Sequence, residues 1–408
     1  MLDLAYVRSH FPALSGDWIF MDNAGGSQTL KTVSDRISDY LLTSDVQHGA
    51  SYEVSQIATQ RVRQANQAMA TFINATYAEE VVMGASATMV FRLLSLCLAK
   101  TLEAGDEIIV SNADHEANVS PWTDLADQGI VIKIWKVRPE TMEFHLEDLG
   151  TLMTDRTRLV CVTHTSNVLG TLNPVKEYAR FVHDRGALIA VDGVAHAPHR
   201  LIDVQETDVD FYVFSTYKVY GPHYALLYGK KEHLLRLPGI NHYFIQQDDL
   251  PYKFQPGNNN FELTYSMLGV VDYLEAVAQH HQPDASRSSR ANMELAFELF
   301  VEHEERLAAR FLDFLNSQAS VRVVGSTDSS KSVRVPTISF VVDGMQSDHL
   351  VEQVDPHKIG IRFGDFYAKK LIEDLDLESY NGVVRVSLVH YNTLEEVDRL
   401  IGVLEKIL

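Results

Sequence analysis

The chain has 408 residues, 46% of them hydrophobic and 22% charged, which is ordinary for a globular protein large enough for two domains. Its formal net charge of −20 disfavours nucleic acid and anionic membranes as partners, because both are negatively charged. No apolar run approaches the ~20 residues of a membrane helix, the first residues lack the features of a secretion signal, and two cysteines cannot build a disulfide framework, so we expect a cytoplasmic protein.

Short apolar runs alternate with helical patterns between residues 75 and 230. The runs indicate strands over residues 80–84, 107–111, 129–137, 158–163, 188–192 and 209–214. Amphipathic spacing indicates helices over residues 88–100 and 174–185. Strands that alternate with helices predict an α/β fold, with a mostly parallel sheet that carries helices on both of its faces.

The pattern changes after residue 280, where a polar segment over residues 280–286 follows a helix that begins near residue 266. The rest of the chain predicts a long helix over residues 287–317, strands over 321–324 and 335–342, and a final helix over 394–408. We therefore expect a large domain over residues 19–285 and a smaller α+β domain over residues 286–408. Residues 1–18 are expected to pack on the smaller domain.

Two charged residues stand at or just past the ends of predicted strands. Asp192 ends one apolar run and precedes a glycine, and Lys218 follows the run over residues 209–214. Ligands of open α/β sheets collect at the carboxyl ends of strands. A buried lysine amine reacts with aldehydes, and a carboxylate can keep a pyridine nitrogen protonated. A pyridoxal phosphate enzyme needs both of these groups. Taken singly, a surface lysine and a turn-capping aspartate are the simpler interpretations.

Three further strand ends carry polar groups that could face the same ligand. Around Ser86 and Thr88, small residues before a helix could bind a phosphate through hydroxyl groups and backbone N–H groups, although a helix N-cap is the alternative. Asn167 could donate to the phenolate oxygen of a cofactor, or simply form a turn. His115 could stack on a flat cofactor, or lie in a turn or on the surface.

Arg385 lies within an apolar strand pattern over residues 382–388. A charge inside such a strand needs a partner, because burial of an unpaired charge is costly. A substrate carboxylate bound by both guanidinium arms would satisfy it, and so would an internal salt bridge.

In this order, the motifs resemble the class V aminotransferase family and, within it, the cysteine desulfurase-like proteins. The resemblance covers almost the whole chain and is carried by residues 20–26, 114–118, 166–170, 191–193, 214–222 and 391–397. It implies a fold-type I pyridoxal phosphate-dependent transferase, with a mostly parallel sheet of the seven-stranded type in the large domain. It also implies a homodimer whose active site lies at the subunit interface.

Carried over residue by residue, the resemblance makes Lys218 the Schiff-base lysine, Asp192 the partner of the pyridine nitrogen and His115 the ring that stacks on the cofactor. It makes Asn167 a cofactor contact and Arg385 the residue that holds the substrate's α-carboxylate. The expected contacts around the cofactor phosphate are Ser86, Ala87, Thr88, Ser215 and Tyr217, the last of which stands where the family often has a histidine.

Three more positions depart from the family pattern. Asn258, expected from the other subunit, stands where the family often has a threonine beside the phosphate. Ala195 stands where many members have a glutamine that contacts a cofactor oxygen. On the loop over residues 361–368, Tyr367 occupies the position of the cysteine with which desulfurases take up sulfur as a persulfide. The two cysteines, Cys97 and Cys161, lie in a predicted helix and a predicted strand, away from this loop.

The sequence therefore predicts a pyridoxal phosphate enzyme that acts on an α-amino acid through a Cα carbanion, with Lys218 as the base. Since the loop has no thiol, we expect β-elimination of the C–S lyase type ahead of transamination or epimerisation, which begin identically. Genuine cysteine desulfuration, a non-catalytic pyridoxal phosphate-binding protein and an α/β module for another phosphorylated ligand remain alternatives. No metal site is expected.

Overall fold

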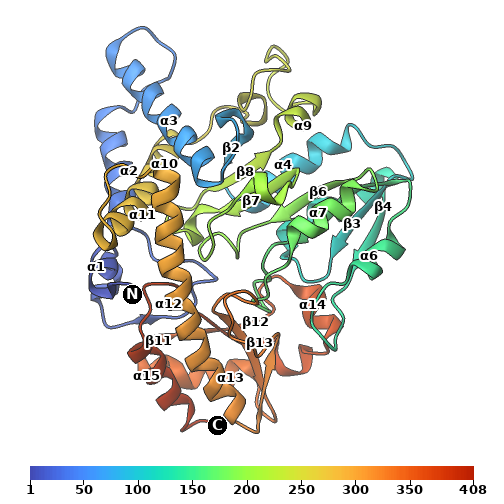
Figure 1. The fold of residues 1–408 in the computed structure, drawn as a ribbon. Coiled ribbons are helices and arrows are strands. Elements are labelled where there is room, and N and C mark those ends of the chain that lie inside the picture. The colour runs from blue at the N-terminus through green and yellow to red at the C-terminus, as the bar shows by residue number, and fades with distance from the viewer.

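A seven-stranded sheet forms the centre of the computed structural model, which describes residues 1–408 (Figure 1). The strand order is β2-β8-β7-β6-β5-β3-β4, and only β8 runs antiparallel to its neighbours, so the prediction of a mostly parallel sheet is confirmed. In chain order the strands are β2 (Val81–Gly84), β3 (Glu107–Ser111), β4 (Val131–Trp135), β5 (Thr157–Thr163), β6 (Leu188–Asp192), β7 (Phe211–Ser215) and β8 (Ala225–Gly229).

Helices cover both faces of this sheet, because successive strand residues point to opposite sides. On one face Val82 and Ile108 share a buried core with helix α4. On the other face Val81 and Ile109 share a core with α3, α7, α11 and α12. These helices are α3 (Glu53–Phe72), α4 (Ala87–Ala99), α7 (Val175–His183), α11 (Leu268–His281) and α12 (Ser289–Ser317). Other helices in this part of the chain are α1 (Leu4–Ser9), α2 (Lys31–Thr43), α5 (Ser120–Thr123), α6 (Leu146–Leu152), α8 (Val204–Thr207), α9 (Lys231–Arg236) and α10 (Phe261–Ser266).

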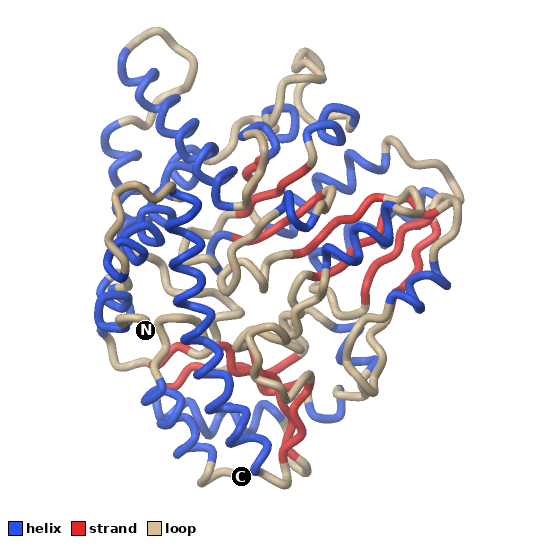
Figure 2. The backbone as a smooth tube through the Cα atoms, viewed as in Figure 1, coloured by secondary structure: helices blue, strands red, loops and turns tan.

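A second, antiparallel sheet is built from the C-terminal part of the chain, and Figure 2 shows its strands as a separate group. Its order is β12-β13-β10-β9, and the short strand β1 pairs in parallel with β11 beside it. The strands are β1 (Ile19–Phe20), β9 (Val321–Val324), β10 (Thr337–Val342), β11 (Ile359–Gly360), β12 (Arg362–Gly364) and β13 (Val383–Ser387). The helices of this part are α13 (Ser347–Val354), α14 (Lys369–Asp374) and α15 (Leu394–Leu404).

Helix α12, 29 residues long, passes from one core into the other. Its residues Met293 and Phe297 belong to the core of the large sheet, whereas Leu307 and Phe311 belong to the core of the second sheet. The predicted domain boundary after residue 285 falls just before this shared helix.

Several predicted elements differ from the structure in extent. The strand expected over residues 129–137 is limited to β4, since Gly129 adopts a left-handed φ of 85° in the preceding turn. The helix expected from near residue 266 is α11, which begins at Leu268, and a separate short helix, α10, precedes it. The final helix ends at Leu404, four residues before the end of the chain. None of the helices combines the length and apolar composition needed to cross a bilayer.

Candidate active site

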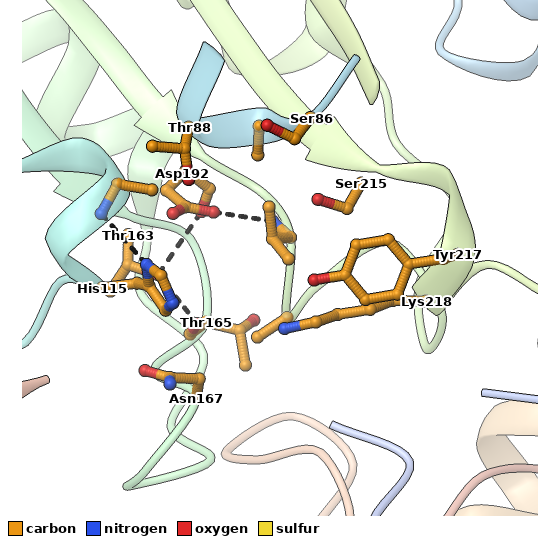
Figure 3. Close-up of a pocket in the computed structure, with 14 residues that line it drawn as sticks. Ser86, Thr88, His115, Thr163, Thr165, Asn167, Asp192, Ser215, Tyr217 and Lys218 are labelled. Carbon is orange, nitrogen blue, oxygen red and sulfur yellow. Dashed lines mark hydrogen bonds between the residues drawn. The ribbon is translucent and has the colours of Figure 1, made fainter. Parts of the chain in front are cut away.

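The carboxyl ends of β3, β5, β6 and β7 lie at one edge of the large sheet, and the turns beyond them surround a cavity. Its volume is about 70 Å³. Figure 3 shows Ser86, Ser215 and Tyr217 on one side and His115, Asp192 and Asn167 on the other, with Lys218 reaching between them. An outer cavity of about 280 Å³ shares part of this lining and adds Arg385 and the loop over residues 362–367.

Lys218 ends a short 3-10 turn that directly follows β7, and its side chain is buried. Burial lowers the pKa of its amine to about 8, because a charged ammonium is poorly solvated there. The guanidinium of Arg385 contributes to this lowering of the pKa, while the carboxylates of Asp192 and Asp22 act against it. About a tenth of the amine is therefore neutral and nucleophilic at pH 7, far more than for an ordinary lysine.

Asp192, the last residue of β6, is buried on the opposite side of the cavity. Its Oδ1 accepts a hydrogen bond from the backbone N–H of Val194 at 2.8 Å. Burial raises the pKa of the carboxyl to about 6, although the Val194 N–H and the Lys218 charge lower it, so the group is ionised at neutral pH. The next residue must be glycine, because a Cβ at Gly193 would lie 2.0 Å from the ring of Tyr212.

His115 follows β3 and its Nδ1 accepts a hydrogen bond from the backbone N–H of Ala117 at 3.0 Å. Burial, with help from the charges of Lys218 and Arg385, lowers its pKa to about 4, so the imidazole is neutral. The turn is held by Asp114, a residue without a role in our sequence analysis. Its carboxyl accepts from Asn118 Nδ2 at 2.7 Å and from the Thr163 N–H at 2.9 Å.

The N-cap Ser86 and the first two residues of α4, Ala87 and Thr88, line the cavity. Ser86 is the N-cap of α4, because its hydroxyl accepts a hydrogen bond from the Met89 N–H at 3.2 Å. The prediction of a helix N-cap is therefore confirmed. Ser86 can still contact a ligand, because it also lines the cavity. Ser215 and Tyr217 add two more hydroxyl groups near this helix end.

Arg385 is buried in β13 and donates to Asp22 Oδ1 at 2.8 Å and to the Asn167 carbonyl at 3.2 Å. The internal salt bridge, one of the two alternatives from the sequence, is thus present. Its Nε–H has no hydrogen-bond partner, which leaves a buried donor beside the outer cavity. No sequence pattern marked Asp22 as the partner, because it lies 363 positions from Arg385 in the chain.

The loop that carries Tyr367 is fixed to the cavity wall by backbone groups. Asn167 Nδ2 donates to the Phe366 carbonyl at 2.9 Å, and the Glu116 N–H donates to the Tyr367 carbonyl at 2.8 Å. Phe366 and Tyr367 both have left-handed φ values, 53° and 60°, which cost energy in residues with a Cβ. The Tyr367 side chain is 65% exposed, with its ring centroid 5.1 Å from that of His115.

Asn258 is the one predicted site residue that lines neither cavity. It is exposed in a separate, largely apolar cavity of about 390 Å³, on the other side of the turn before α4. Ala117, in the turn after β3, also lines the inner cavity without a role in our sequence analysis, and so do Thr163, Thr165 and Val194 at the ends of β5 and β6. The positions of these last three follow from the pairing of β5 with β6, which the sequence does not display.

The chemistry of the cavity fits pyridoxal phosphate. A buried amine with a lowered pKa suits an aldehyde, an ionised carboxylate suits a protonated pyridine nitrogen, and a neutral imidazole suits the face of the ring. The first turn of α4, with nearby hydroxyl groups, suits the phosphate.

The sequence signature of the Aminotransferase class-V family matches residues 19–400. The chain is 44% identical to the aminotransferase-like protein FGM3 of Gibberella zeae, over 98% of both chains. It is 35% identical to the cysteine desulfurase-like protein ustD of Aspergillus flavus, over 100% of this chain and 91% of that one. The structure of a cysteine desulfurase from Thermococcus onnurineus superimposes with a TM-score of 0.86 at 25% identity, over 100% of this chain and 98% of that one. The chain therefore belongs to the class V aminotransferase family and is a fold-type I enzyme that depends on pyridoxal phosphate.

Proposed function

We propose that this enzyme acts on an α-amino acid and eliminates a sulfur substituent from its β-carbon, a reaction of the C–S lyase type. The observation that carries the proposal is the pairing of a buried, partly neutral Lys218 amine with a nearby loop that has a tyrosine in place of a nucleophilic cysteine. The enzyme thus has a base for the Cα proton and no thiol to accept sulfur.

In this proposal the inner cavity holds the cofactor. Ser86, Thr88 and Ser215 bind the phosphate, Asp192 keeps the proton on the ring nitrogen, and His115 stacks on the ring. When bound, pyridoxal phosphate supplies an electron-withdrawing ring that stabilises negative charge at the substrate's Cα. Asn167 Nδ2 carries two N–H groups, of which one donates to the Phe366 carbonyl and the other donates to the cofactor.

Arg385 orients the substrate by its α-carboxylate in the outer cavity. Its guanidinium remains charged despite burial, and its Nε–H has no protein partner to lose. A carboxylate at this position brings Cα toward Lys218, since both residues line the outer cavity. The neutral Lys218 amine then removes the Cα proton, the Cβ–S bond breaks, and the sulfur leaves with the bonding electrons as a thiolate, which takes up a proton from solvent to become a thiol. Water hydrolyses the remaining unsaturated amino acid to pyruvate and ammonia.

Neither cysteine is suited to accept sulfur from a substrate. Cys97 is buried on α4 and Cys161 is buried in β5. Burial raises the pKa of Cys97 to about 11 and raises that of Cys161 above its ordinary value, so neither is a thiolate at neutral pH. These thiols also support a reducing, cytoplasmic location for the protein.

We propose that the protein is a homodimer in which Asn258 reaches the phosphate of the other subunit. Met89 and Leu96 on α4 are 57% and 55% exposed and line the apolar cavity that contains Asn258. Exposed apolar groups gathered in one place are typical of a protein interface.

A spectral screen of amino acids with product analysis tests the proposal. Addition of a β-thio amino acid should change the absorption of the yellow holoenzyme and release a thiol, pyruvate and ammonia. Release of a keto acid with pyridoxamine phosphate would indicate transamination. Alanine together with a protein-bound persulfide would indicate desulfuration and would contradict the argument from Tyr367. A yellow protein whose spectrum no amino acid alters would favour a non-catalytic role.

A further inference from the structure

A buried polar chain runs behind the inner cavity and ends at Thr165. Tyr212 Oη lies 2.9 Å from His164 Nδ1, and the His164 ring stacks on the His196 ring with centroids 3.5 Å apart. His196 Nδ1 lies 3.1 Å from the hydroxyl of Thr165, which lines the cavity. The chain therefore connects the core of the sheet to the cavity wall.

Both imidazoles are neutral. Burial lowers the pKa of His164 to about 3 and holds that of His196 well below its usual range. A buried network of this kind is costly unless its hydrogen bonds are satisfied, so it restricts the rotamers of its members. The network thus fixes the direction of the Thr165 side chain, whose residue is fully buried.

The Thr165 hydroxyl has bonding capacity left over. A threonine hydroxyl has one donor and two acceptor sites, and His196 takes up one of these. The neighbouring Thr163 hydroxyl has no proton left to donate to a cofactor, because it already donates to the Thr165 carbonyl at 2.7 Å. Across the same cavity Ala195 presents only a methyl group.

We propose that Thr165 is a further cofactor-contacting residue, whose hydroxyl is held by His196 and supplies the polar contact that the side chain of Ala195 cannot make. The proposal rests on the proposed position of pyridoxal phosphate in the inner cavity. Thr165 and Asn167 lie on the side of this cavity toward which the Lys218 amine extends (Figure 3). His196 is a positioning residue in this scheme, because it acts through Thr165.

Absorption spectra and cofactor loss on dialysis test this proposal in the full-length holoenzyme. Thr165→Val should shift the absorption maximum of the bound cofactor and accelerate its loss roughly fivefold, as expected for one lost hydrogen bond. His196→Phe retains a stacked ring without Nδ1 and should shift the same two quantities in the same direction by a smaller amount. The matched control is Thr157→Val, at the far end of β5, where a buried hydroxyl donates to Glu107 at 3.0 Å.

The control should lose stability in a thermal melt while its spectrum and cofactor loss match those of the unaltered protein. A Thr165→Val protein with an unchanged spectrum and rate of cofactor loss would overturn the role of Thr165 alone. The same changes in Thr157→Val would also overturn it, because they would then reflect stability. An unaltered protein that binds no pyridoxal phosphate would overturn the proposed function and this proposal together.

Discussion

At Lys218, burial and charge act against each other within one cavity. Burial and the Arg385 guanidinium favour the neutral amine, whereas Asp192 and Asp22 favour the ammonium. The result is a pKa of about 8, between the ordinary value of 10.5 and that of a fully desolvated lysine. The amine can therefore react with an aldehyde and can also carry a proton at physiological pH, and a general base needs both properties.

The pH dependence of cofactor capture follows from this pKa. Only the neutral amine attacks the aldehyde, so the rate at which the cofactor-free protein takes up pyridoxal phosphate should rise about tenfold per pH unit below pH 8 and level off above it. Asp22→Asn removes a charge that raises the pKa of Lys218 and should move the midpoint to lower pH. Stopped-flow absorbance provides the measurement, and a midpoint near 10.5 in the unaltered protein would contradict the argument.

Several of the residues predicted from sequence lie a short distance past the end of a strand. His115, Asn167 and Lys218 each stand a few residues past an apolar run, so their convergence on one edge follows from a parallel sheet. Asp22 and Thr165 lacked such a signal. Asp22 lies beside Arg385 because it forms a parallel bridge with Ser387 of β13, and Thr165 is distinguished only by its contact with His196.

Among the elements, helix α4 links the large sheet to the side of the cavity where we propose that the phosphate binds. Its apolar face, including Val90 and Leu94, packs on the sheet, which fixes the direction of its axis. Its first turn then presents free backbone N–H groups and the positive end of the helix dipole to the cavity. The sequence predicted this helix to within one residue at each end, because an apolar stripe and a small-residue turn both marked it.

Replacement of two N-caps separates a stabilising role from a binding role. Ser86→Ala and Ser288→Ala each remove a hydroxyl that accepts the hydrogen bond of a helix's first turn, in α4 and α12 respectively. Each should lower the free energy of unfolding by about 1 kcal/mol. Only Ser86→Ala should also weaken cofactor binding, by roughly fivefold, because Ser288 lies outside the cavity. Denaturant titration and equilibrium dialysis measure the two quantities, and equal cofactor affinity in both variants would refute a phosphate contact at Ser86.

In the molecule as a whole, both sheets contribute residues to the site. The inner cavity is lined by turns of the large sheet, and the outer cavity is completed by β12, β13 and the loop between β12 and α14. The alternation of strands and helices predicted the first sheet and its faces. The contact between the two sheets could not be predicted, because it depends on how α12 packs in both cores at once.

Mixed dimers test whether the two subunits share their sites. Asn258→Asp should repel the phosphate of the partner's cofactor, and Lys218→Ala removes the base, so each variant alone should be inactive. Random mixing makes half of the dimers mixed, each with one intact site, and should restore about a quarter of the activity of the unaltered protein. Size-exclusion chromatography checks the dimer, and no recovery after subunit exchange would mean that each chain builds its site alone.

The ion pair between Asp22 and Arg385 can form only late in the synthesis of the chain. The two residues are 363 positions apart, so at ordinary ribosomal rates Asp22 waits roughly 20 to 70 s for its partner. The residues around the inner cavity, from Ser86 to Lys218, all emerge well before that time. The lining of the inner cavity is therefore synthesised before Arg385, the residue that we propose binds the substrate's α-carboxylate.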